Sequence, residues 1–198
     1  MGRLVVVENV SLDGVVQAPG RPDEDTRGGF TRGGWASPLL MADPEAARAA
    51  MAGQEQTSGM VFGRRTYLDL VGYWLSAPAP NPFADVLART PKHVASRTLS
   101  EPLPHPASAL LRGDAVTAVR ALVEQAEGQL VVLGSGALVR DLAAAGLVDT
   151  YVLTILPVVL GSGTRLFGDT YAELDVTRSV VSPTGIVTAS YAVRHPTG

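Results

Sequence analysis

Four short polar or glycine-rich segments of this sequence have residue types that could hold phosphate groups or position a polar ligand. Each follows an apolar run that predicts a strand: residues 11–14 (SLDG), 63–66 (GRRT), 96–98 (SRT) and 134–136 (GSG). The carboxyl ends of parallel strands meet at one edge of a sheet, and ligands usually bind outside that edge. We therefore expect the four segments to converge on one site.

The segment Gly134-Ser135-Gly136 lies between an apolar run and a helical pattern. This order places free backbone N–H groups and the positive end of a helix at the mouth of a buried strand, where they could hold phosphate or pyrophosphate. The segment lacks the Lys-Ser/Thr of a P-loop and the third glycine of a Rossmann fingerprint. A tight turn without any ligand is therefore an equally open interpretation of this motif by itself.

The same six residues, VVLGSG, occur twice, at 131–136 and at 158–163. The second copy follows Pro157 and continues into residues 164–167 (TRLF) without a helical pattern behind it. We expect the first copy to be a ligand cradle. We expect the second copy to be a structural turn.

The two remaining turns after strands carry guanidinium and hydroxyl groups. Arginine suits phosphate because its planar fork donates two hydrogen bonds at once, although charged residues also crowd solvated helix starts. So many cationic donors favour a nucleotide with an extra phosphate. The residues concerned are Arg64, Arg65 and Thr66 after Gly63, and Ser96, Arg97 and Thr98.

Apolar runs alternate with helical patterns through most of the chain, and two alternating runs stand at its end. This order predicts an α/β fold whose mostly parallel sheet is covered on both faces and ends in an antiparallel hairpin. The long Gly- and Pro-rich stretch at 14–38 predicts a functional loop. Expected strands are 4–10, 60–62, 92–96, 130–133, 150–156, 176–181 and 186–193; expected helices are 44–56 (with Asp43 as N-cap), a helix after 63–66, 115–127 and 137–145.

The composition limits the class of protein. With 198 residues, 46% of them hydrophobic, one domain over residues 1–198 is expected. A net charge of −3 and a pI near 5.6 give no basic footprint for nucleic acid or for an anionic membrane. The chain has no cysteine, and its three histidines have no metal-ligand spacing, so we expect no metal site and a cytoplasmic location.

The quoted motifs together resemble the dihydrofolate reductase superfamily. They are SLDG at 11–14, GRRTY at 63–67, VASRTL at 94–99 and the stretch from LGSGALVRDL to GSGTRLF at 133–167. The match is closest to the branch that includes the reductase domain of bifunctional riboflavin-biosynthesis deaminase–reductases and stand-alone reductase-like proteins. The resemblance implies a three-layer α/β fold, NADPH as cofactor and a homodimer that pairs through the terminal hairpin.

The resemblance also assigns binding roles. It implies that the 63–66 and 96–98 segments hold the 2′-phosphate and the pyrophosphate. The turn that begins at Gly134 would approach the pyrophosphate and the nicotinamide, with Ser135, Gly136, Ala137 and Leu138. The loop at 14–38 falls where the family carries a mobile lid, which would place Gln17, Phe30 and Trp35 over the substrate.

A catalytic acid is harder to assign. The family position on the helix before GRRT falls near Ala47, which is not acidic. The candidates are Asp13, Glu45 and Thr154, the last of which matches a substrate-orienting strand threonine. Asp13 could instead close an Asx turn, Glu45 could be a surface charge near a helix start, and Thr154 an ordinary strand residue.

The sequence therefore predicts an NADPH-dependent reductase that transfers a hydride to a pterin- or pyrimidine-type small molecule. Reduction of 5-amino-6-(5-phosphoribosylamino)uracil in riboflavin biosynthesis is the sharpest candidate, and dihydrofolate reduction is the alternative enzymatic reaction. A nucleotide-binding module that has kept the fold and lost the chemistry is the rival from another class.

Overall fold

The structure is a computed structural model that describes residues 2–51 and 57–194. The chain forms two compact units, each built from discontinuous segments. The first unit comprises Met1–Leu4 and Gln56–Leu147, and the second comprises Val5–Glu55 and Val148–Gly198. The single domain expected from the length stays a prediction.

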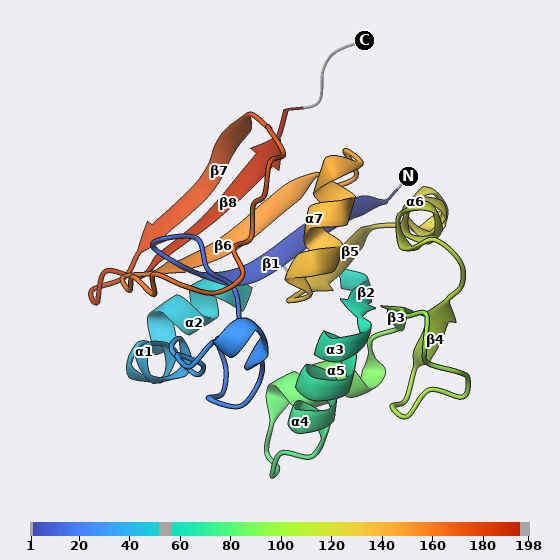
Figure 1. The fold of residues 1–198 in the computed structure, drawn as a ribbon, viewed down its shortest axis with the longest axis horizontal. Coiled ribbons are helices and arrows are strands. Elements are labelled where there is room, and N and C mark those ends of the chain that lie inside the picture. Colours follow the sequence, from blue (N-terminus) through green and yellow to red (C-terminus); the bar gives the residue numbers. More distant parts are fainter. Residues whose placement is uncertain (1, 52–56, 195–198) are drawn as a thin grey trace. The chain divides into compact units, whose positions relative to one another are not determined.

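The first unit is a parallel sheet with helices after most of its strands (Figure 1). Its strand order is β4-β3-β2-β5, and every neighbouring pair is parallel. The strands are β2 (Thr57–Gly63), β3 (Lys92–Ala95), β4 (Ser108–Leu111) and β5 (Gln129–Leu133). The helical segments are α3 (Arg64–Thr66), a π turn (Tyr67–Val71), α4 (Gly72–Leu75), α5 (Pro82–Arg89), α6 (Ala115–Gln125) and α7 (Gly136–Ala144).

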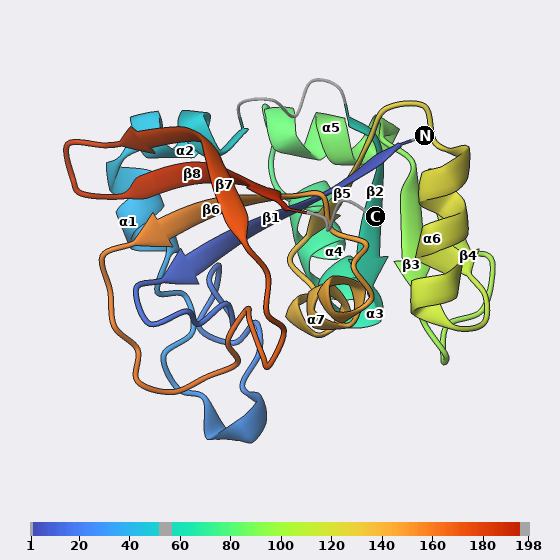
Figure 2. The ribbon, with the colours of Figure 1, turned by 90° about the horizontal axis from the view of Figure 1, so that it is seen from above.

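Alternation along β2 separates the two faces of this sheet. Met60 and Phe62 pack with Tyr67, Val71 and Leu87 in one apolar cluster, and Leu87 belongs to α5. Helix α7 also contacts β2; α7 lies above and α5 below that strand in Figure 1, and Figure 2 shows the two helices near its opposite ends. The first unit therefore has helices on both faces of its sheet.

Polar side chains fix the starts of two helices in this unit. The Asn81 side chain accepts a hydrogen bond from the backbone N–H of Ala84, and Pro82 takes the first position of α5. Asp114 accepts from the backbone N–H of Thr117 at the start of α6. Such caps satisfy backbone donors that a helix leaves unpaired.

The second unit combines one parallel and two antiparallel strand pairs. Its order is β1-β6-β8-β7, with β1 parallel to β6 and β8 antiparallel to both β6 and β7. Helix α2 contacts β6, β7 and β8. The elements are β1 (Arg3–Ser11), a 3₁₀ turn (Arg27–Gly29), α1 (Ser37–Ala42), α2 (Pro44–Met51), β6 (Thr150–Leu156), β7 (Leu174–Val181) and β8 (Val187–Val193).

The long loop after β1 and the segment after β6 are joined in the second unit. Val15 pairs with Arg165 in an antiparallel bridge, and the backbone N–H of Val16 donates to Thr164 O at 2.9 Å. Phe30 is buried with Val15 in a small apolar cluster. The 14–38 loop is therefore a packed part of this unit.

The fold class predicted from the sequence is confirmed. The strands form parallel pairs from β4 to β5 and from β1 to β6, and the chain ends in the β7–β8 hairpin. Asp43 is the N-cap of α2, because Ala46 N–H donates to its Oδ1 at 3.0 Å. The last part of the predicted 44–56 helix, residues 52–56, lies outside the described residues.

Three short elements were not predicted: α1, α5 and β4. Helix α1 has six residues and β4 has four, so neither is long enough to repeat its hydrophobic pattern clearly. Each of the three elements also stands beside prolines, which are usually loop signals. In α5 the proline occupies the first helical position, where it is compatible with a helix.

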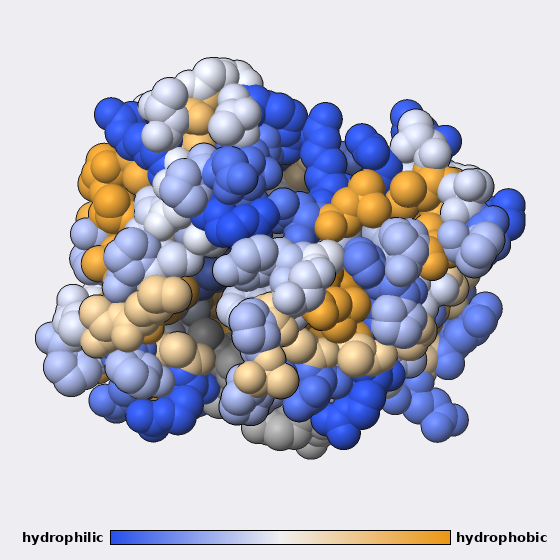
Figure 3. Space-filling view, turned by 90° about the horizontal axis from the view of Figure 1, so that it is seen from below, coloured by the Kyte–Doolittle hydropathy of each residue, from blue (hydrophilic) through white to orange (hydrophobic). Residues whose placement is uncertain are grey.

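Among the described residues, no helix is both long enough and apolar enough to cross a bilayer. On the face seen in Figure 3, hydrophobic side chains form several separate groups among hydrophilic ones. Small and separate groups of exposed apolar side chains such as these are normal on protein surfaces.

Candidate functional site

A cavity of about 320 Å³ lies at the carboxyl ends of β2, β3 and β4, within the first unit. This is the edge at which parallel sheets usually bind ligands. An adjoining cavity of about 590 Å³ shares Ser96, Arg97 and Gly113 with it. The first cavity is lined by Gly63, Arg64, Ala95, Ser96, Arg97, Thr98, Leu111, Gly113, Ala115, Leu138 and Asp141.

Two arginines give the cavity a cationic rim. Arg64 and Arg97 are exposed, and neither forms an ion pair within the described part of the chain. The pKa of Asp114 lies below its usual value, mainly because Thr117 donates to its carboxylate and, to a smaller extent, because Arg97 is near. Two guanidinium groups on one cavity are suited to a phosphate group.

The polypeptide after β3 folds into a tight hydroxyl turn. Ser96 Oγ accepts hydrogen bonds from the backbone N–H groups of Thr98 at 3.1 Å and Leu99 at 3.0 Å. Those two N–H groups are therefore engaged, whereas the Ser96 and Thr98 hydroxyls belong to residues that line the cavity. The turn holds Arg97 at the rim.

The first VVLGSG copy connects the turns after β5 and β2. Gly134 and Ser135 both have positive φ, of 62° and 66°. Ser135 Oγ accepts a hydrogen bond from the backbone N–H of Gly63 at 2.9 Å. A Cβ on Gly134 would lie 2.8 Å from Thr66 Cγ2, so only glycine fits there without a shift. The N–H of Gly63 is therefore not free to bind a ligand. This differs from a simple ligand cradle, in which the backbone N–H groups are free to bind phosphate.

The start of α7 is open to an anion. No side chain among the described residues caps this helix, and Leu138 of its first turn lines the cavity. The first N–H groups of a helix lack partners inside it and carry a partial positive charge. The donor set of the cavity, which combines two guanidinium groups, two hydroxyls and this helix end, fits the phosphates of a dinucleotide.

Six of the residues predicted to bind the cofactor line the cavity, and six do not. Gly134 and Ser135 act on it indirectly, through Thr66 and Gly63, and Arg65 is exposed outside it. Those that line it are Gly63, Arg64, Ser96, Arg97, Thr98 and Leu138; those that do not are Arg65, Thr66, Gly134, Ser135, Gly136 and Ala137.

Sequence reasoning missed the far wall of the cavity. Leu111 and Gly113 follow β4, Ala115 begins α6 and Asp141 lies on α7. Leu111, Gly113 and Ala115 were missed because β4 was not predicted. A strand that ends at Leu111 places the turn before α6 at the same edge of the sheet as the other turns. Asp141 sits one helical turn after Leu138, so its position could have been read from the helical period.

The carboxylate of Asp13 holds the second VVLGSG copy in place by accepting hydrogen bonds from its backbone. Its carboxylate accepts from Leu160 N–H at 3.0 Å, Gly161 N–H at 2.8 Å and Ser11 Oγ at 2.7 Å. The hydrogen bonds from Leu160, Ser11 and Gly161 lower the pKa of Asp13 to about 2. At neutral pH this group has no proton to give, so its geometry favours the structural alternative over acid catalysis.

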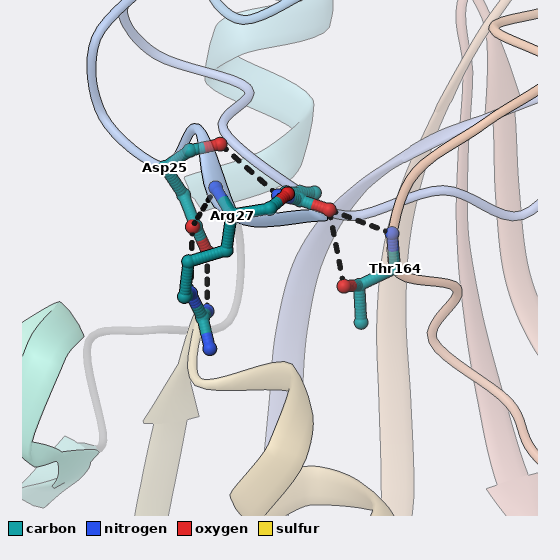
Figure 4. A network of polar contacts seen from close by, with 4 residues as sticks. Asp25, Arg27 and Thr164 are labelled. Carbon is teal, nitrogen blue, oxygen red and sulfur yellow. Dashed lines mark hydrogen bonds and ion pairs between the residues drawn. The ribbon is translucent and has the colours of Figure 1, made fainter. Parts of the chain in front are cut away.

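Gln17 is the centre of a hydrogen-bond network in the 14–38 loop (Figure 4). Its Nε2 donates to the carbonyl oxygens of Asp25 and Arg27, both at 3.0 Å. Its Oε1 accepts from the N–H and the hydroxyl of Thr164, at 2.9 and 3.1 Å. The amide therefore has its usual hydrogen-bonding capacity filled by protein groups.

Phe30 and Trp35 give the same loop its packing. Phe30 is 4% exposed, and Trp35 is half-buried. Trp35 Nε1 also donates to Gln17 O at 2.8 Å. The three residues predicted to cover a substrate therefore hold the loop in its observed conformation.

Among the described residues of the helix expected to carry an acid, none on the buried side is acidic. In α2 the buried residues are Ala46 and Ala49, whereas Glu45 is exposed in the first turn. The pKa of Asp43 is lowered to about 2, first by the Ser182 hydroxyl and also by Thr184. Neither acidic residue is arranged as a proton donor.

Thr154 lies in a row of polar side chains on one face of the second unit. It is 2% exposed, and its partners in register are Asn9 on β1 and Thr188 on β8. Thr188 Oγ1 is buried and has no hydrogen-bond partner in the described structure. Residues directly opposite in register share a face, so the three side chains form a neutral polar group.

Glu8 is a buried acid that was not among the predicted site residues. It is 5% exposed, and burial raises its pKa to about 8, with a further contribution from the charge of Glu24. The available signal was a lone acidic residue inside the apolar run VVVENV. Buried carboxyls with raised pKa values gather at functional sites.

The family model described as the RibD C-terminal domain matches residues 3–188. No protein of curated function matches the sequence.

Three solved structures share the fold. A protein named for riboflavin biosynthesis, from Shewanella sp. PV-4, is 22% identical with a TM-score of 0.65, and the match covers 98% of this chain and 99% of that one. A pyrimidine reductase-like protein from Corynebacterium diphtheriae is 17% identical with a TM-score of 0.59, over 98% and 92% of the two chains. Dihydrofolate reductase from Enterococcus faecalis, complexed with NADP(H) and RAB-propyl, is 16% identical with a TM-score of 0.58, over 98% and 97%. These similarities confirm the fold predicted from the motifs.

Proposed function

This chain belongs to the RibD C-terminal domain family, and we propose that it is an NADPH-dependent reductase of a pyrimidine- or pterin-type substrate. The observation that carries the proposal is the cavity at the ends of β2, β3 and β4, with Arg64 and Arg97 on its rim and the uncapped start of α7 beside it. A bound NADPH would supply a hydride. The protein would orient the cofactor and the substrate and exclude water.

We assign the 2′-phosphate to the side of the cavity that holds Arg64, Ser96, Arg97 and Thr98. Two guanidinium groups and two hydroxyls could hold a dianion there through charge-assisted hydrogen bonds. The pyrophosphate would lie nearer the start of α7. NADH lacks the 2′-phosphate, so the same residues would favour NADPH.

The sharpest substrate is 5-amino-6-(5-phosphoribosylamino)uracil. Dihydrofolate reduction is less well supported, because the buried side of α2 carries Ala46 and Ala49 and its acidic Glu45 is exposed. A neutral row of Asn9, Thr154 and Thr188 suits the uncharged hydrogen-bonding edge of a pyrimidine. A homodimer through the β7–β8 hairpin and a cytoplasmic location are part of the same proposal.

The cofactor assignment is tested with the double substitution Arg64→Ala and Arg97→Ala. We expect the dissociation constant of NADPH, measured by titration calorimetry, to rise by about 100-fold or more, since charge-assisted hydrogen bonds contribute about 1.5–3 kcal/mol each and two are lost. The dissociation constant of NADH should change by less than about threefold. Arg120→Ala is the matched control, because Arg120 is exposed on α6 and outside the cavity.

An equal loss for NADPH and NADH would place the 2′-phosphate elsewhere. Catalysis is tested by following NADPH oxidation with a panel of pterins and riboflavin precursors. Turnover of the ribosylamino-pyrimidine supports the proposed reaction, and turnover of dihydrofolate alone supports the alternative. Tight NADPH binding without turnover of any member would favour a catalytically silent binding module.

A further inference from the structure

One carboxylate lines the cavity whose arginines suit phosphate groups. Asp141 lies on α7, one helical turn after Leu138, and both residues line the cavity of about 320 Å³. Among the described residues of that lining, Asp141 is the one acid. Its negative charge repels the same phosphates that Arg64 and Arg97 attract. An acid at this position therefore weakens phosphate binding and needs another explanation.

Helix α7 itself does not require an acid at this position. An acidic side chain stabilises a helix through its dipole only in the first turn, and Asp141 lies beyond the first turn of α7. On a helix surface, the side chains that can pair with it lie three or four residues away. Those neighbours are all uncharged: Ala137, Leu138, Ala144 and Ala145. Neither the helix dipole nor an ion pair along the helix therefore accounts for Asp141.

The charged side chains of the cavity come from different elements. Arg64 and Arg97 stand on the turns after β2 and β3, whereas Asp141 belongs to the helix that follows β5. Neither arginine forms an ion pair within the described part of the chain, so these opposite charges do not neutralise each other. Apolar side chains complete the lining: Ala95, Leu111, Ala115 and Leu138. A ligand that matches this lining has an anionic group, an apolar body and a hydrogen-bond donor.

An adenine nucleotide has these three features together. Its phosphates are anionic, its flat base has two apolar faces, and the exocyclic amino group of the base is a hydrogen-bond donor. A carboxylate only accepts hydrogen bonds, so it pairs with an amino group. Hypoxanthine carries a carbonyl oxygen in place of that amino group, and a carboxylate repels this second acceptor. A carboxylate in the base-binding part of the cavity would therefore distinguish the two bases.

We propose that Asp141 selects the base of the cofactor by accepting a hydrogen bond from the exocyclic amino group of adenine. This inference rests on the function proposed above. Leu111, Ala115 and Leu138 supply the apolar contacts to the base, and the arginines hold the 2′-phosphate. The charge of Asp141 costs some affinity for the phosphates, and the hydrogen bond to adenine offsets that loss. Asp141 is thus a specificity-determining residue and takes no part in hydride transfer.

The test compares the binding of NADPH with that of its hypoxanthine analogue, in which a carbonyl oxygen replaces the amino group of adenine. Both dissociation constants are measured by titration calorimetry without any substrate. We expect the wild type to bind the analogue about tenfold more weakly. This is the lower end of the range for a hydrogen bond to a charged group, because Asp141 is exposed. In Asp141→Asn the ratio should fall below about threefold, because an amide can also donate to a carbonyl oxygen.

The matched control is Asp85→Asn, the same chemical change at an exposed position of α5 outside the cavity. Both dissociation constants, and their ratio, should remain those of the wild type. The melting temperatures of the ligand-free variants show whether each is folded. Asp141→Asn keeps the shape of an exposed side chain, so its melting temperature should stay close to that of the wild type.

The two proposals fail in different ways. Equal binding of NADPH and its analogue by the wild type overturns the role of Asp141 and leaves the reductase intact, and this measurement is made on the unmodified chain. If Asp141→Asn bound both nucleotides more tightly by the same factor, Asp141 would act only through its charge, which also overturns the proposal. Absence of NADPH binding in the wild type contradicts the proposed cofactor, and the role of Asp141 falls with it.

Discussion

The two copies of VVLGSG, at 131–136 and 158–163, have the same six residues and different structures. In the first copy, Val132 is fully buried in β5 and the glycines lead into α7. In the second copy, the equivalent Val159 is 66% exposed in a loop after β6. Local sequence does not distinguish these two outcomes, so partners elsewhere in the chain must decide them.

The interactions that hold the first copy differ from those that hold the second. The first copy is fixed by its own sheet, because Val131 and Val132 pair with Met60 and Val61 of β2. The second copy is fixed by polar side chains far away in sequence. Asp13 accepts from two of its N–H groups, and Arg32 donates to Leu160 O at 2.7 Å. The first segment is therefore held by sheet pairing and burial, and the second by hydrogen bonds from distant side chains together with the burial of Leu160 against Val15 and Phe30.

The largest expected effect is at the last glycine of the second copy. Gly163 has a φ of 111°, and a Cβ there would lie 2.7 Å from Val15 Cγ1 and 2.9 Å from Phe30 Cε2. Gly163→Ala should lower the free energy of unfolding by about 3 kcal/mol, from backbone strain and from crowding of two buried side chains. Urea denaturation measures this difference.

The matched control is Gly161→Ala in the same loop. Gly161 also has a positive φ, of 73°, but nothing lies within 4 Å of the added Cβ. Only the backbone cost of about 1–2 kcal/mol remains. Equal losses for the two variants would show that the packing of Gly163 against Val15 and Phe30 contributes nothing.

The next largest effect is expected at Val132 of the first copy, and it is compared with the effect at the equivalent Val159 of the second. Val132→Thr buries a hydroxyl group at a fully buried strand position and should cost about 2 kcal/mol. Val159→Thr changes an exposed residue and should alter the free energy of unfolding by less than about 0.5 kcal/mol. Both values come from the same denaturation experiment. Similar losses would mean that the second copy is as tightly packed as the first.

The sequence predicted the elements that are long enough to repeat their hydrophobic pattern several times. Residues 150–156 are a strand with the predicted bounds, and α6 lies within the helix predicted at 115–127, with Val119 and Val123 buried. The alternating runs at the end form the β7–β8 hairpin. These segments are long enough for burial to leave a pattern, which is why the fold class could be read from the chain.

The site was predictable only where a turn follows a recognised strand. Arg64, Ser96 and Arg97 line the cavity as expected, because β2 and β3 were recognised. Gly113 was missed with β4, whose four residues carry little pattern. The roles of Gln17 and Asp13 depend on Thr164 and Leu160, more than 100 residues away, and no local rule reveals such hydrogen bonds.

The smallest expected effect lies at the serines of the two copies. Ser135 Oγ accepts from Gly63 N–H at 2.9 Å, so Ser135→Ala should lower the free energy of unfolding by about 1 kcal/mol. Ser162 Oγ accepts from exposed Arg32 Nη1 at 3.3 Å, and Ser162→Ala should have an effect below about 0.5 kcal/mol. Urea denaturation of the two variants gives the comparison.

The Ser135 variant also tests whether the first copy serves the cavity. The Ser135–Gly63 hydrogen bond joins the turn before α7 to the turn that precedes Arg64, so losing it should loosen both walls together. NADPH binding should then weaken in Ser135→Ala and stay unchanged in Ser162→Ala. If Ser135→Ala lost stability without losing NADPH affinity, the first copy would be a structural turn like the second, and the phosphates would have to be held by the arginine rim alone.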